Sequence, residues 1–139
     1  MLDLNEAITG RSSLREYTAQ IVDEPIVYSL TSAAIQAPNA VNQQPWTFSL
    51  LRDEHILDHV SREAKLPMSS NIPASSHAGS LLSMVNDRDF HTLYHATTLI
   101  VMPAAAEGPW IVEDCSLAAQ NPMLAAYAAG LGDCWIGFA

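Results

Sequence analysis

The most constraining feature of the sequence is an alanine-rich stretch over residues 111–129, which is followed directly by Gly130-Leu131-Gly132. A glycine just past the last turn is typical of a helix C-terminus, so the stretch predicts one long helix. Pro122 lies in the middle of it. Because proline removes a backbone hydrogen bond and clashes with the preceding turn, we expect a kink or a break there.

Two shorter helices are predicted nearer the N-terminus. Asp3 followed by Glu6 fits a capping box and predicts a helix that ends near Gly10. Asp23 can cap a second helix, which Pro38 stops. The apolar residues at helical spacing are Leu4, Ala7 and Ile8 in the first helix, and Ile26, Leu30, Ala33 and Ala34 in the second.

The strand signals are short and scattered. Trp46, Phe48 and Leu50 alternate with polar residues, and residues 97–102 form an apolar run that suits a buried central strand. Residues 134–137 also have strand character. A third helix is expected after Asp53, a loop over residues 65–79, and a further short helix that includes Leu81, Leu82 and Val85. This order predicts a single α+β domain over residues 1–139 rather than regular βαβ alternation.

Composition excludes several classes of protein. The net charge of −9, with only six Lys and Arg, argues against a nucleic-acid surface. The apolar runs are much shorter than the roughly 20 residues that cross a bilayer, and the N-terminus lacks a secretory signal, so we expect a cytoplasmic location without membrane insertion. In that compartment Cys115 and Cys134 are expected to be free thiols that contribute to packing.

The few cations include a cluster at Arg11-Ser12-Ser13-Leu14-Arg15. Two guanidinium groups and two hydroxyls over this short span could hold a phosphate group, because guanidinium geometry matches phosphate oxygens. The alternative is a solvated turn whose arginines pair with Glu6 or Glu16. The residues alone leave both interpretations open.

A second polar cluster lies between two prolines, at Pro38-Asn39-Ala40-Val41-Asn42-Gln43-Gln44-Pro45. Its side-chain amides offer hydrogen-bond donors and acceptors that could contact the edge of a planar heterocycle. An ordinary turn before a strand would have a similar composition, since Asn bonds readily to its own backbone.

The two clusters, together with Gly130-Leu-Gly-x-Cys-Trp-Ile-Gly137, resemble the nitroreductase family in order and separation. The resemblance implies an α+β fold with a central antiparallel or mixed sheet flanked by helices, and with the long helix at the interface of a homodimer. It also implies an FMN-dependent oxidoreductase. Such an enzyme passes electrons from NADH or NADPH, in a two-step exchange, to a small-molecule acceptor such as a nitroaromatic or a quinone.

The same resemblance assigns site residues by motif. Arg11, Ser13 and Arg15, with Ser12 adjacent, match positions that hold the FMN phosphate and ribityl chain. The loop that meets the flavin ring, which the other subunit provides in the family, is matched by Pro38, Asn39, Ala40, Asn42 and Gln44. Ile136 and Gly137 match a segment whose backbone approaches the reactive edge of the ring. Chemistry carried by FMN requires no catalytic side chain.

The sequence departs from the family pattern in three respects. Asn39 stands where the family often has a small Ser, and Pro122 interrupts the long helix. The family normally continues past Trp135-Ile136-Gly137 with a strand that crosses the dimer and a late basic residue, so the chain is expected to be shortened at its C-terminus.

Other interpretations remain open from the sequence. The chain could be a flavin-binding module for storage or sensing without turnover, or an acidic interaction domain without flavin. His91 and His95 are four residues apart, but the sequence offers no obvious third ligand, so no metal site is predicted.

Overall fold

A computed structural model describes residues 3–71 and 78–137. It contains five α-helices, one 3-10 helix and a small antiparallel sheet, which confirms the α+β class. The elements follow in the order α1 (Leu4–Gly10), α2 (Glu24–Ala34), η1 (Ala40–Asn42), β1 (Ser49–Leu51), α3 (Glu54–Asn71), α4 (Ala78–Asn86), β2 (Leu99–Val101) and α5 (Ile111–Ala128).

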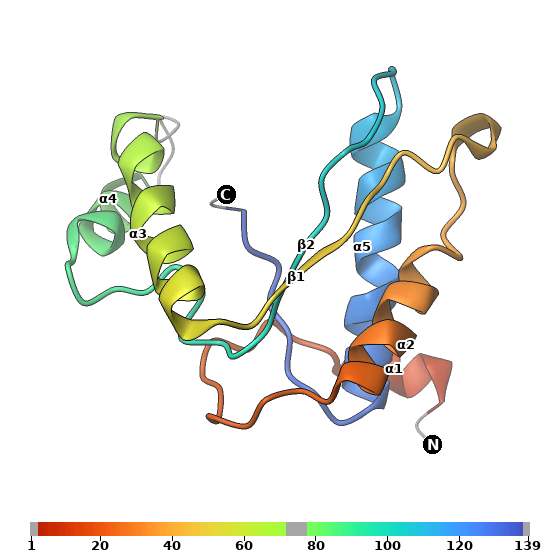
Figure 1. The fold of residues 1–139 in the computed structure, drawn as a ribbon, viewed down its shortest axis with the longest axis horizontal. Helices are drawn as coiled ribbons and strands as arrows, with labels where there is room; N and C mark the ends of the chain where they lie inside the picture. Colours follow the sequence, from red (N-terminus) through yellow and green to blue (C-terminus); the bar gives the residue numbers. More distant parts are fainter. Residues whose placement is uncertain (1–2, 72–77, 138–139) are drawn as a thin grey trace.

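The two strands run between two groups of helices. Figure 1 shows α3 and α4 at one end of the molecule and α1, α2 and α5 at the other, with β1 and β2 crossing between them. The strands pair antiparallel, and Leu50 lies opposite Ile100. The predicted strand at 97–102 is confirmed at its centre, but β2 is half-buried rather than buried, because β1 is its only hydrogen-bonded neighbour among the described residues.

The core lies where α2 packs against α5. Ala34 and Ala118 are completely buried, and alanine side chains allow the two helix backbones to approach closely. Asn121 in the middle of α5 donates a hydrogen bond from Nδ2 to the carbonyl oxygen of Ala33 at 3.0 Å. A cluster of Ala37, Trp46 and Ala118, with the half-buried Phe48, Met102 and Cys115, extends this core toward the strands.

Two predicted helix ends are confirmed, namely the start of α1 and the end of α5. Asp3 and Glu6 form the capping box of α1. At the end of α5, Gly130 has a φ of 77°, its N–H donates to the carbonyl of Tyr127, and the N–H of Leu131 donates to that of Ala126. These two bonds are the Schellman arrangement, in which glycine avoids the cost of a Cβ in the left-handed region.

Three sequence predictions about regular structure differ from what is observed. Of the kink or break expected at Pro122, the break does not occur, since α5 is continuous from Ile111 to Ala128 and packs along α2. The expected loop over 65–79 is helical on both sides, since α3 continues through Pro67 to Asn71 and α4 begins at Ala78; residues 72–77 lie outside the described part. Residues 134–137 form no strand, and pairing there is limited to one bridge between Ser13 and Asp133.

Much apolar surface remains open on this chain. Its accessible area is 9112 Å², whereas a folded monomer of 15.1 kDa exposes about 7,100 Å². Exposed apolar side chains on and around α5 include Trp110, Val112, Leu117 and Trp135. A group of exposed apolar side chains such as this is typical of a face that further polypeptide covers. Within the described residues, no helix is both long and apolar enough to cross a bilayer.

Candidate functional site

The Arg11–Arg15 segment lies directly against the chain that follows α5. Ser13 and Asp133 form an isolated parallel bridge, and the N–H of Leu14 donates to the carbonyl of Asp133 at 2.9 Å. The contact is close, since a Cβ on Gly132 would lie 2.6 Å from Cδ1 of Leu14. The structure therefore brings together two motifs that are almost the whole chain apart in sequence.

Arg11 takes part in this junction through an ion pair. Its Nη1 lies 3.0 Å from Oδ1 of Asp133, and both side chains are partly buried. Burial raises the pKa of the Asp133 carboxyl, and the Arg11 guanidinium opposes that rise. The sequence had suggested Glu6 or Glu16 as acidic partners, but the carboxylate of Glu6 closes the α1 capping box instead. The side chain of Asp133 is thus a structural partner that sequence reasoning missed.

Arg15 is held differently. Its guanidinium lies 5.8 Å from the centroid of the Tyr94 ring, within the range of a cation–π contact. In the described part of the structure it makes no ion pair or hydrogen bond, and the hydroxyls of the exposed Ser12 and Ser13 make none either. These donors are therefore available to an anion.

Tyr17 fixes the end of this segment. Its hydroxyl donates to the carbonyl of Leu14 at 2.7 Å, and burial raises its pKa to about 12, with Cys134 and Asp133 adding to the rise. The phenol consequently stays protonated and keeps its donor role at any physiological pH. Tyr17 and Tyr94 both adjoin the cluster.

Ile136 and Gly137 follow the same junction. Ile136 is half-buried and Gly137 is exposed. A Cβ placed on Gly137 would meet no atom within 4 Å, so there is open space beside its backbone. Two residues separate Ile136 from Asp133, so the predicted ring-edge segment begins close to the point where the chain contacts the Arg cluster.

The amide-rich loop braces itself. Oδ1 of Asn39 accepts from the backbone N–H of Gln44 at 2.8 Å, and Oδ1 of Asn42 accepts from Nε2 of Gln44 at 3.3 Å. The φ angles of Val41, Asn42 and Gln44 are all positive, between 48° and 54°. A β-branched residue rarely adopts this conformation, so Val41 marks a strained backbone that the surrounding contacts must hold.

A buried carboxylate provides that support. Asp114, in the first turn of α5, is 4% exposed, and both of its oxygens accept from the backbone N–H of Ala40, at 3.1 and 3.2 Å. Pro45 and Trp46 are buried on the following side of the loop, while Pro38 and Asn42 are exposed. The loop is therefore anchored at both ends and open in its middle. Sequence reasoning placed Asp114 in the helix without a role.

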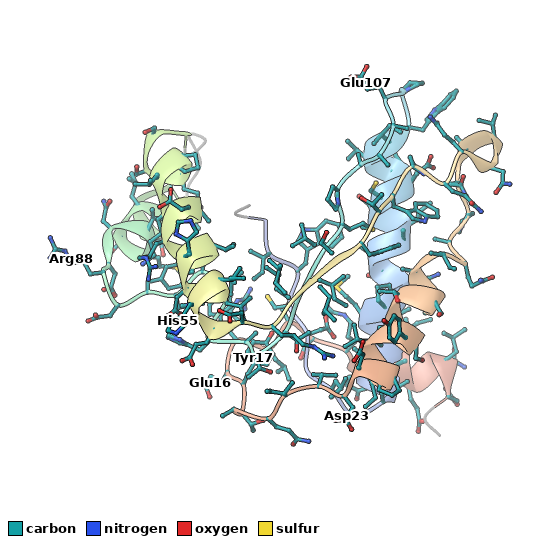
Figure 2. All side chains as sticks on the ribbon, in the orientation of Figure 1. Glu16, Tyr17, Asp23, His55, Arg88 and Glu107 are labelled. Atoms are coloured by element: carbon teal, nitrogen blue, oxygen red, sulfur yellow. The ribbon has the colours of Figure 1, made fainter. Side chains whose placement is uncertain are left out.

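The two predicted clusters do not meet within one chain. The loop contacts the first turn of α5, whereas the Arg cluster contacts the segment after its end. These points are separated by most of an 18-residue helix, on the order of 20 Å at 1.5 Å per residue. Figure 2 shows the same separation, with Glu107, whose carbonyl accepts from Gln43, far from Glu16 and Tyr17.

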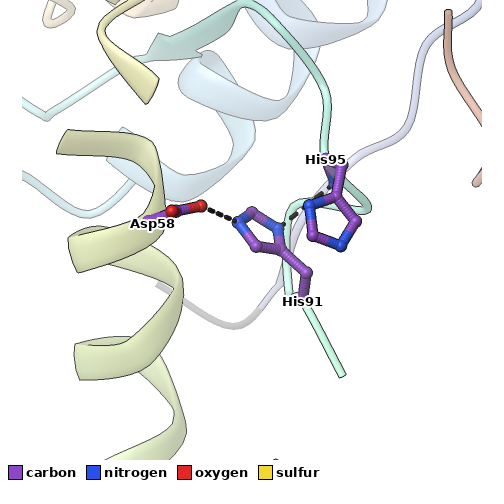
Figure 3. A group of neighbouring side chains, drawn as sticks. All are labelled: Asp58, His91 and His95. Atoms are coloured by element: carbon purple, nitrogen blue, oxygen red, sulfur yellow. Dashed lines mark hydrogen bonds and ion pairs between the residues drawn. The ribbon is translucent and has the colours of Figure 1, made fainter. Parts of the chain in front are cut away.

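A third cluster joins α3 to the turn before β2. Asp58, His91 and His95 place one potential ligand atom each within 4.8 Å of one another, and Figure 3 shows their arrangement. Asp58 is the third group that the sequence did not reveal. Nδ1 of His91 accepts from the backbone N–H groups of Leu93 and His95, both at 3.2 Å, and Nε2 lies 3.2 Å from Oδ1 of Asp58.

These bonds decide the role of His91. A neutral imidazole has one donor and one acceptor nitrogen, so acceptance at Nδ1 places the proton on Nε2, facing Asp58. A metal ion would require a lone pair at Nε2, which this tautomer lacks. Burial lowers the pKa of His91, and His95 lowers it further, against the effect of Asp58. The cluster is thus arranged as a hydrogen-bond bridge.

The two cysteines form no disulfide and are half-buried. Burial raises the pKa of the Cys115 thiol, and the neighbouring Asp114 adds to the rise. A protonated thiol is a weak nucleophile, so Cys115 contributes packing to the core.

Known proteins resemble the chain in sequence. The chain is 33% identical over 98% of its length to a Methanothermobacter thermautotrophicus protein provisionally named NADH dehydrogenase/NAD(P)H nitroreductase, of which it spans 61%. It is 28% identical to an Archaeoglobus fulgidus protein of the same name, over 94% of this chain and 64% of that one. It therefore spans less than two thirds of the length of these curated relatives.

Solved structures share the fold. A Bacteroides fragilis nitroreductase with bound FMN superimposes with a TM-score of 0.84 at 24% identity, over 98% of this chain and 70% of that one. An FMN-dependent nitroreductase from Clostridium difficile gives a TM-score of 0.80 at 25% identity, over 97% of this chain and 62% of that one. The sequence profile of the nitroreductase family matches residues 8–139, and the chain belongs to that family.

Proposed function

We propose that this chain binds FMN and functions as an NAD(P)H-dependent oxidoreductase that reduces nitroaromatics, quinones or similar electron-poor acceptors in a two-step exchange. The observation that carries the proposal is the contact of Ser13 with Asp133, which aligns the Arg cluster with the segment leading to Gly137. The segment that we assign to the phosphate and the segment that we assign to the ring edge, far apart in sequence, are thereby joined. The FMN-containing relatives of this fold support the same assignment.

The donor set fits a flavin phosphate. Arg15 has no acidic partner among the described residues, and the hydroxyls of Ser12 and Ser13 lie in the same exposed segment. Guanidinium and hydroxyl donors of this kind suit phosphate oxygens. Arg11 differs, since one of its nitrogens already bonds to Asp133, so we assign it to holding the junction and, through its remaining N–H groups, to supporting the phosphate.

A homodimer would bring the amide-rich loop of one chain to the Arg cluster of the other. The amide-rich loop lies on the order of 20 Å from the Arg cluster of the same chain, so a second copy has to bring its loop to the first copy's cluster. Asn39, Ala40, Asn42 and Gln44 would then meet the ring, beside Pro38. The open apolar surface around α5 gives such a homodimer an interface.

The residues of this chain bind and orient rather than react. FMN, when bound, supplies hydride acceptance and release. Arg15 and the serine hydroxyls would hold its phosphate, and the backbone at Ile136 and Gly137 would lie against its ring. Side-chain amides of the loop would donate hydrogen bonds where negative charge develops on the reduced ring, which favours that charge in a water-poor site. No acid or base side chain is required.

Binding of FMN to the purified protein tests the cofactor assignment. Flavin fluorescence quenching should give saturable binding, and Arg15→Ala should weaken it about 10-fold or more, because a hydrogen bond to a charged group contributes about 1.5–3 kcal/mol. Arg88→Ala is the matched control. Arg88 is an exposed arginine that Figure 2 shows at the outer edge of the α3–α4 group, away from Tyr17.

Two further measurements separate the alternatives. Steady-state NADH or NADPH oxidation with a quinone distinguishes an enzyme from a flavin-binding module without turnover. A protein that stays colourless after incubation with FMN would instead support an acidic interaction domain. A monomeric mass in the presence of saturating FMN would contradict the shared site.

A further inference from the structure

The turn before β2 is held in an unusual conformation by contacts with α3. Tyr94 and His95 have φ angles of 52° and 56°, in the left-handed region that residues with a Cβ seldom occupy. Residues in this region persist only where neighbouring structure holds them there. The turn therefore needs external support.

That support comes from one face of α3. Thr92 is completely buried, its N–H donates to Oγ of Ser61 at 2.8 Å, and its hydroxyl lies 3.2 Å from the same oxygen. His91 adds the bridge drawn in Figure 3, from Asp58 on α3 to the backbone N–H groups of the turn. Both contacts fix the backbone on each side of Tyr94.

The fixed turn presents the Tyr94 ring to Arg15. The ring makes a T-shaped contact with Phe90, with centroids 5.8 Å apart. The guanidinium of Arg15 lies 5.8 Å from the ring centroid. A cation–π contact attracts the charge without accepting a conventional hydrogen bond, so all five N–H donors of Arg15 stay available.

We propose that Tyr94 is a positioning residue that holds Arg15 ready for the flavin phosphate. The inference rests on the proposed FMN binding, and it assigns to the 91–95 turn a part in cofactor affinity. An exposed arginine has many rotamers, and the ordering of such a side chain on binding opposes association. The ring of Tyr94 reduces that cost by restricting Arg15 before the phosphate arrives.

The test compares FMN with riboflavin, which lacks the phosphate. Tyr94→Leu should weaken FMN binding roughly two- to fivefold, the effect of losing one exposed cation–π contact, and leave riboflavin binding unchanged. Tyr94→Phe retains the ring and should bind FMN nearly as wild type does. Tyr28→Leu is the matched control, because Tyr28 is an exposed tyrosine on α2, outside the Arg cluster.

A double-mutant cycle with Arg15→Ala gives the sharper outcome. If Tyr94 acts through Arg15, Tyr94→Leu should have no further effect on FMN binding in the Arg15→Ala background. Equal weakening of FMN and riboflavin, or additive effects in the cycle, would overturn the proposal. Should Tyr94→Leu fail to fold by circular dichroism, His91→Ala, which loosens the turn, carries the same comparison. Wild-type protein that binds no FMN would instead overturn the proposed function itself.

Discussion

The amide-rich loop and the Arg cluster are both exposed, yet they are held by opposite means. Residues 39–44 adopt a strained backbone, and a buried carboxylate of Asp114 anchors it through the N–H of Ala40. Residues 11–15 are extended and rely on a backbone bridge, a partly buried ion pair and a cation–π contact. The difference predicts that removal of the Asp114 carboxylate disrupts the whole loop, whereas removal of any single contact of the Arg cluster lowers the free energy of unfolding less.

The largest effect is expected at the loop anchor. Asp114→Ala leaves the N–H of Ala40 without its described acceptor and opens a space in the core, so the free energy of unfolding should fall by about 1–3 kcal/mol. Asp114→Asn keeps one acceptor oxygen and should lose less. Urea denaturation of both variants measures the difference. Equal stability of Asp114→Ala and wild type would show that the loop does not depend on this carboxylate.

The next effect concerns the turn that leads from α5 to the Arg cluster. Gly130→Ala should cost about 1–2 kcal/mol, because alanine is disfavoured at a φ of 77°. A Cβ there would meet no atom within 4 Å, so the cost is conformational rather than steric. Thermal unfolding of the variant measures it.

Gly79 provides the matched control. It also has open space around its Cβ position, but it lies within α4. Gly79→Ala should therefore stabilise the protein slightly, since alanine is the better helix former. Changes of the same sign in the two variants would remove the backbone explanation.

The ion pair between Arg11 and Asp133 should contribute less to the free energy of unfolding. Arg11→Ala leaves the Asp133 carboxylate without its described partner and should lower stability by about 1 kcal/mol at pH 7. Burial already raises the pKa of Asp133, and loss of Arg11 should raise it further. A group with a raised pKa in the folded state opposes folding once it ionises. The stability deficit of Arg11→Ala should therefore be small in acid and grow as the pH rises through that pKa.

Asp133→Asn is the companion variant. It removes both the burial cost of the carboxylate and its attraction to Arg11, so its effect on the free energy of unfolding should be smaller than that of Arg11→Ala. Urea midpoints measured from pH 4 to 8 give both curves. A larger loss in Asp133→Asn would mean that attraction to Arg11 outweighs burial.

Helices α1 and α5 were largely predictable because their signals are local. A capping box, an alanine-rich run and a glycine after the last turn each depend on residues within one or two turns, and all three are found. The prolines misled for the same reason. Pro67 and Pro122 are locally unfavourable in a helix, but α3 and α5 continue through them, and α5 is packed along α2 across that point.

Contacts between distant residues were not predictable. The pairing of Arg11 with Asp133 spans 122 positions, and the Asp58 bridge to His91 spans 33. No periodicity connects such residues, so the sequence could suggest a phosphate clamp without revealing which arginine is free. The family resemblance implied that the loop serves the other subunit, but the position of the loop and the Arg cluster at opposite ends of α5 comes from the three-dimensional arrangement.

The smallest effect on stability is expected at His91, which holds the turn that carries Tyr94. Burial, together with His95, lowers the pKa of His91 in the folded protein, against Asp58 and with a minor contribution from Lys65. The unfolded chain therefore takes up the proton first. The contribution of neutral His91 to stability is complete above about pH 6.5 and is lost as the pH falls through the lowered pKa. Protonation at Nδ1 would also face two N–H donors of the turn.

His91→Asn separates titration from hydrogen bonding. Asparagine can accept from the backbone two residues on, so the turn keeps an acceptor while the titrating ring is removed. Unfolding midpoints should fall less between pH 7 and 5 in this variant than in wild type. His55→Asn, which changes an exposed α3 histidine whose ring makes no hydrogen bond to the described residues, should retain the wild-type slope. If His91→Asn retains that slope as well, protonation of His91 is not what destabilises the protein in acid.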